Sequence, residues 1–104
     1  MSNVPESTTD LTGALSNDLF RVVSLQQRGS LVASERFLQE AKRWANPLRK
    51  HQVKKYITDI ATAVDLADAK DLSLGKTERY LMYAVLLQNY TLHAQSIEYD
   101  TIHL

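Results

Sequence analysis

The sequence predicts an all-α fold, and three observations favour it. Only three Gly and two Pro occur in 104 residues, whereas residues with high helix propensity are frequent. No segment alternates apolar and polar residues for long enough to form a strand. Two groups of helix-breaking residues, "ANPLR" at 45–49 and "DLSLGKTE" at 71–78, divide the chain into helical stretches. The sequence therefore predicts an antiparallel three-helix bundle with a long first helix.

Length and composition predict a single domain. The small polar residues at 1–11 predict a disordered N-terminal tail, and residues 12–104 a single helical domain. The N-terminus lacks the apolar stretch of a secretion signal, and the uncharged run at 80–97 contains too many polar residues to span a membrane. A cytoplasmic protein without membrane contact is therefore expected. The absence of cysteine excludes disulfides and cysteine-based metal sites.

The first helical stretch, at 14–45, contains one candidate break at Gly29-Ser30. At about 100° per residue, the apolar residues before and after this point lie on the same side of one continuous helix. This agreement favours a single long helix; a break at Gly29, which would give four helices, is the alternative. The shared stripe consists of Leu15, Leu19, Val22, Val23, Ala33, Phe37, Ala41 and Trp44.

A continuous first helix would be longer than its neighbours. Thirty residues span about 45 Å, whereas the second and third helices would span about 35 Å each. With a tight turn at Asn46-Pro47, Leu11, Leu15 and Leu19 would then lack cover within the chain. This overhang predicts a homodimer or higher oligomer, unless the chain folds back at Gly29.

The second stretch, at 47–70, is conventionally amphipathic, with Asn46 as the predicted N-cap and Pro47 as the first helical residue. Its predicted buried stripe comprises Val53, Tyr56, Ile57, Ile60, Val64 and Ala67.

The third stretch, at 76–98, is apolar on two nearly opposite sides. A helix of this kind in a three-helix bundle either is shared with a partner or has both sides covered by the other helices. We expect the tyrosine-rich side to form the partner interface, because tyrosine combines apolar area with a polar hydroxyl. One side carries Tyr80, Tyr83, Leu87, Tyr90 and Ala94, and the other Leu81, Val85 and Leu92.

The motifs that carry chemistry are missing or incomplete. "LGKT" at 74–77 resembles the end of a phosphate-binding loop, but position 70 is Lys and no strand precedes it. None of the three histidines has an acid or a second histidine at a metal-binding spacing. The acidic residues of the second helix fall mainly on its polar half, where solvation keeps their chemistry ordinary. No catalytic, cofactor-binding or metal site is predicted, and the protein is not expected to be an enzyme.

The second helix begins with basic residues and ends with acidic ones, the reverse of what the helix dipole favours. Its basic patch comprises Arg49, Lys50, Lys54 and Lys55. Three explanations remain open. Glu98 and Asp100 neutralise the patch within the fold; an acidic protein surface, such as the 59–71 half of another copy, meets it; or nucleic acid binds it with help from Trp44 and Tyr56.

Together these patterns predict a small helical protein–protein interaction module, serving as an adaptor, regulatory or assembly subunit, that self-associates. The alternative is a nucleic-acid-associated small subunit of a larger complex, using the basic cluster at 42–55. The predicted partner interface comprises Leu15, Leu19, Tyr80, Tyr83, Leu87 and Tyr90. The cluster at 42–55 adds Lys42 and Arg43 to the basic patch.

Overall fold

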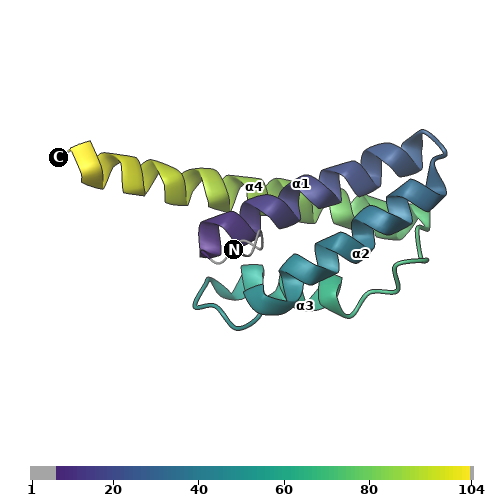
Figure 1. Ribbon diagram of the computed structural model, residues 1–104, viewed down its shortest axis with the longest axis horizontal. Helices are drawn as coiled ribbons and strands as arrows, with labels where there is room; N and C mark the ends of the chain where they lie inside the picture. Colours follow the sequence, from purple (N-terminus) through teal and green to yellow (C-terminus); the bar gives the residue numbers. More distant parts are fainter. Residues whose placement is uncertain (1–6, 104) are drawn as a thin grey trace, which may run out of the picture.

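The computed structural model describes the backbone of residues 7–103 and the side chains of residues 7–95. All regular secondary structure in this part of the chain is helical, which confirms the predicted all-α class. The chain reverses direction from each helix to the next (Figure 1). The four helices are α1 (Thr8–Gln27), α2 (Leu31–Leu48), α3 (Lys55–Asp65) and α4 (Leu74–His103).

The chain breaks at Gly29, so the continuous first helix is wrong and the four-helix alternative is correct. Gly29 has a φ angle of 80°, which glycine adopts without the steric cost that a Cβ atom would bring. The Gly29 and Ser30 amides donate to the carbonyls of Gln26 and Leu25, which closes the end of α1 in the manner of a C-terminal cap. α2 then folds back along α1 instead of extending it.

α1 begins inside the segment expected to be a disordered tail. Ser7 is its N-cap, and the Ser7 hydroxyl accepts a hydrogen bond from the Asp10 amide at 3.0 Å. Residues 8–11 are therefore helical, and Leu11 is fully buried in the core. Residues 1–6 of the predicted tail lie outside the described residues.

The next boundary also differs from the prediction. Pro47 lies in the last turn of α2 rather than at the start of a new helix, and Asn46 is a helical residue rather than an N-cap. α3 starts only at Lys55, and its N-cap residue Lys54 makes no side-chain capping bond. A short connection at 49–54 therefore separates α2 from α3.

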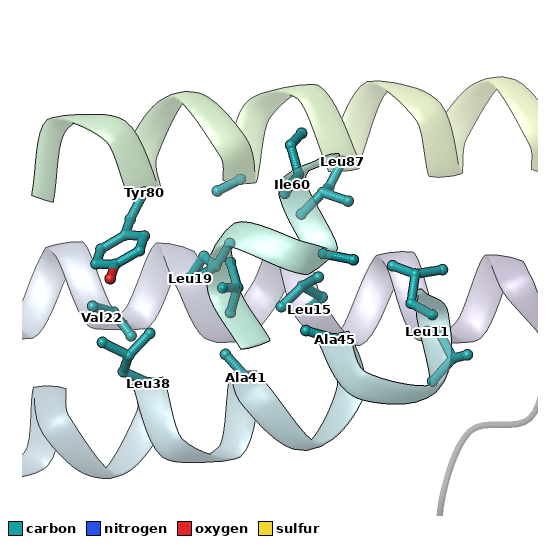
Figure 2. Packing of buried hydrophobic residues seen from close by; sticks show 14 of the residues in the cluster. Leu11, Leu15, Leu19, Val22, Leu38, Ala41, Ala45, Ile60, Tyr80 and Leu87 are labelled. Carbon is teal, nitrogen blue, oxygen red and sulfur yellow. The ribbon is translucent and has the colours of Figure 1, made fainter. Parts of the chain in front are cut away.

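α1 is the central helix of the bundle. It packs against both α2 and α4, and α3 packs on α2. Figure 2 shows α1 between α4 and α2, with Leu15 and Leu19 at the centre of the packed side chains. One apolar cluster links all four helices; its largest fully buried members are Leu11, Leu15, Leu19, Val22, Leu38, Leu48, Ile57, Val64 and Leu87.

Candidate functional site

α4 carries a group of exposed apolar side chains on the side that does not contact α1. Their exposed fractions run from 37% for Leu86 to 71% for Leu74. Single exposed apolar residues are common on protein surfaces, but a contiguous group on one helix marks a candidate contact surface. We call this group the outer face of α4; it comprises Leu74, Leu81, Met82, Val85, Leu86 and Leu92.

Buried hydrogen bonds fix the rotation of α4 about its own axis. The Ser16 hydroxyl of α1 donates to the Ala84 carbonyl of α4 at 2.7 Å. The hydroxyls of Thr12 and Thr91 lie 2.6 Å apart in a second buried hydrogen bond. A buried polar group left without a partner costs about 1–3 kcal/mol. Rotating α4 to bury its outer face would break both bonds, so this face is held toward solvent.

Of the six residues predicted as a partner interface, four are buried in the folded chain and two are half-buried. Leu15, Leu19 and Leu87 have no exposed area, and Tyr80 is 2% exposed. Tyr83 and Tyr90 are partly buried and pack against the same core. The expected overhang does not form, because the break at Gly29 places α2 beside the α1 leucines. The tyrosine-rich side of α4 is thus its inner side, and the stripe of Leu81, Val85 and Leu92 is the exposed one.

Acidic residues of α3 neutralise half of the basic patch. The Arg49 guanidinium lies 2.8 Å from the Asp65 carboxylate, and Lys55 Nζ lies 2.8 Å from Asp59. The hydrogen bond from Arg49 holds the pKa of Asp65 below its usual value. Lys50 and Lys54 are exposed and have no ion pair among the described side chains.

The other expected partners of the patch, Glu98 and Asp100, lie outside the described side chains. Of the two remaining members of the cluster at 42–55, Lys42 Nζ donates to the Ala67 carbonyl just beyond α3. The Arg43 guanidinium lies 5.5 Å from the ring centre of Trp44, within the range of a cation–π contact. Both cations are therefore engaged within the chain.

A surface hollow of about 310 Å³ lies between the start of α3 and the middle of α4. Tyr56 and Tyr90 meet there edge to face, with ring centres 6.4 Å apart. Lys54, Asn89 and His93 complete the lining. The hollow thus joins one cation of the basic patch to two aromatic rings, a combination that suits an anionic or aromatic group.

A buried carboxyl group lies between α1 and α2, where sequence reasoning placed none. Asp18 is 8% exposed, and its Oδ2 atom accepts a hydrogen bond from Trp44 Nε1 at 2.8 Å. Burial raises the pKa of Asp18 to about 6, the Trp44 bond opposes this rise, and the neighbouring Glu40 carboxyl adds to it. The burial of Asp18 is indicated by its position in the sequence, because Asp18 lies within the apolar stripe of Leu15, Leu19 and Val22.

Glu40 also borders a second hollow, of about 380 Å³, on the outside of α2. Phe37 lies in its wall, and the Arg21 guanidinium sits 5.2 Å from the centre of that ring. Arg36 supplies a further cation to the lining. This region brings two carboxyls, two cations and two aromatic rings to one side of the α1–α2 pair.

Trp44, which the nucleic-acid alternative assigns to base stacking, is partly buried and bonded to Asp18. That alternative therefore depends on Tyr56 and Tyr90 for aromatic contact.

Metal-binding geometry is not found in the described part of the chain: no three or more His, Cys, Asp or Glu side chains there are grouped closely enough to hold an ion. Among the same residues, no helix combines the length and apolarity needed to cross a membrane. Comparisons with protein-family models, curated proteins and solved structures found no match to this chain.

Proposed function

We propose that this chain is a small helical protein–protein interaction module that self-associates, and that its contact surface is the outer face of α4. One observation carries the proposal: six apolar side chains are exposed together on the longest helix, while the other side of that helix is bonded to α1. Covering such a face with another apolar surface lowers the free energy of the system.

The area of this face supports a weak, concentration-dependent dimer. Its exposed fractions add up to about three whole side chains per copy, and complete burial of each would contribute about 1.5–3 kcal/mol. Two copies would gain roughly 9–18 kcal/mol, against an association cost of about 4–15 kcal/mol. The midpoints of these two ranges differ by about 4 kcal/mol, which corresponds to a dissociation constant of about 1 mM.

The test is sedimentation equilibrium over a wide range of protein concentration. The wild type is expected to approach twice the monomer mass of 11.8 kDa as concentration rises. The double variant Leu81→Glu/Val85→Glu should stay monomeric, because it would bury carboxylates in the contact. Val32→Glu is the matched control, since Val32 is an exposed apolar residue on α2.

Circular dichroism should show unchanged helix content in these variants, because each replaced side chain is already exposed. A wild type that remains monomeric at all concentrations would overturn the proposal. Equal loss of association in the Val32→Glu control would also exclude α4 as the contact surface.

A further inference from the structure

Four residues of the outer face of α4 lie on a line of six positions that has the spacing of a coiled-coil seam. Successive positions along this line are separated by four, three, four, three and four residues, which is the repeat that keeps one line of side chains facing a second helix. All six positions are exposed. The seam consists of Leu74, Glu78, Leu81, Val85, Gln88 and Leu92.

Two polar residues interrupt the apolar seam, and they restrict how a second copy can pair with it. In a parallel, in-register pair, Glu78 would face Glu78 of the other copy. Like charges opposed at a contact are unfavourable, and one polar seam position often fixes register and orientation. The parallel arrangement is therefore disfavoured.

One antiparallel register matches every seam position with a compatible one. If the two-fold axis passes beside residue 83, Leu81 faces Val85 of the second copy and Leu74 faces Leu92. Glu78 then faces Gln88, whose side-chain amide can donate to the carboxylate. Shifting the register by one heptad toward the C-terminus places Gln88 opposite Val85 instead, which leaves the amide against an apolar side chain.

The exposed apolar area supplies part of a contact with one further helix. Five of the six side chains of the outer face lie on the seam or next to it, and together they expose the equivalent of about two and a half whole side chains. A stable interface of standard size buries about 800 Å² per partner. The polar neighbours Glu78, Gln88 and Asn89, all exposed, lie where they would supply the remaining area.

We infer that the occupant of the outer face is the α4 helix of a second copy of this chain, packed antiparallel with Leu81 against Val85 and Glu78 against Gln88. This inference rests on the proposed self-association and specifies its geometry. By symmetry each contact occurs twice in the dimer.

Disulfide formation tests the register, because the chain has no cysteine of its own. Leu81→Cys, Val85→Cys and Leu92→Cys are made as separate single variants. The variants are mixed two at a time, and one variant in each mixture carries a tag that distinguishes it by size. A mixture of the first two should form the mixed disulfide, since facing seam positions bring the Cα atoms within about 7 Å. Mixed 81–92 disulfides, or disulfides between identical variants, would show a different pairing and overturn the inference.

An exchange of the two polar residues gives an independent readout. Gln88→Glu should weaken the dimer about tenfold, because two carboxylates would then face each other. The double variant Glu78→Gln/Gln88→Glu should restore the affinity, since it only swaps the two groups. Failure of this rescue would reject the register while leaving the sedimentation result, and with it the proposed function, standing.

Discussion

Replacing Asp18 by Asn is expected to stabilise the protein at neutral pH and to remove a pH dependence present in the wild type. Asp18 is almost fully buried, and burial raises its pKa to about 6 from an ordinary value of 3.8. The folded chain therefore holds the Asp18 proton more tightly than the unfolded chain does. Its contribution to stability is complete below pH 3.8 and is lost as the pH rises through 6.

The size of the effect follows from the shift. About two pKa units, at about 1.4 kcal/mol per unit, set an upper limit of about 3 kcal/mol. Residual contact with water and the charge coupling to Glu40 reduce this, so about 1–2 kcal/mol is the expected gain for Asp18→Asn at pH 7.5. Asparagine is neutral at every pH, and its side-chain oxygen can still accept the hydrogen bond from Trp44.

Urea denaturation between pH 4 and pH 7.5 measures this difference, with fluorescence of the single tryptophan as the reporter. The free energy of unfolding of the variant relative to wild type should increase with pH across this interval. Asp59→Asn is the control, because Asp59 is exposed and, among the described side chains, forms its ion pair with Lys55. The free energies of unfolding of wild type and Asp18→Asn are plotted against pH. If the two plots run parallel, burial does not raise the pKa of Asp18, and the expected stabilisation is refuted.

Two further predictions concern the α1–α2 turn and the basic patch. Gly29→Ala should lower the free energy of unfolding by about 1–2 kcal/mol in thermal denaturation, because its positive φ angle strains any Cβ atom. Gly75→Ala, equally open in its surroundings but helical, should leave stability unchanged or raise it, and an equal loss in both would contradict the strain argument. Titration with single- and double-stranded oligonucleotides at low salt tests the nucleic-acid alternative. Salt-dependent binding lost on Lys50→Ala/Lys54→Ala would favour it, and absence of binding would reject it.

The helical class was predictable from composition, but the break at Gly29 was not resolved by helical phase. Apolar residues before and after the break share one phase, which is expected of a continuous helix. A helical hairpin satisfies the same condition, because the stripes of both helices must face each other. The position of Pro47 does not mark the start of a helix, because proline is tolerated in the last turn of α2. α3 instead starts at Lys55, and its N-cap residue Lys54 has no side chain that caps a helix, so the sequence carries no signal for this start.

The two-sided character of α4 was also visible in the sequence, but which side is buried depends on packing partners. Tyrosine suits interfaces in general, so the sequence favours the side with Tyr80 and Tyr90 as the contact surface. The deciding contacts are Ser16 with the Ala84 backbone and Thr12 with Thr91. They join residues far apart in the chain, and small hydroxyl side chains on a helix carry no pattern that announces such a pairing.

The two candidate interaction surfaces differ in how many of their side chains already have partners within the chain. Ion pairs and hydrogen bonds within the chain already engage Arg49, Lys55 and Lys42 on the α2–α3 side. Only Lys50 and Lys54 of the basic patch have no ion pair among the described side chains. The apolar outer face of α4 has no such cover among the described residues. An association through α4 should therefore persist or strengthen in high sulfate concentrations, which favour apolar burial. A contact through the basic patch should weaken as salt screens its charges, so salt dependence alone assigns the surface.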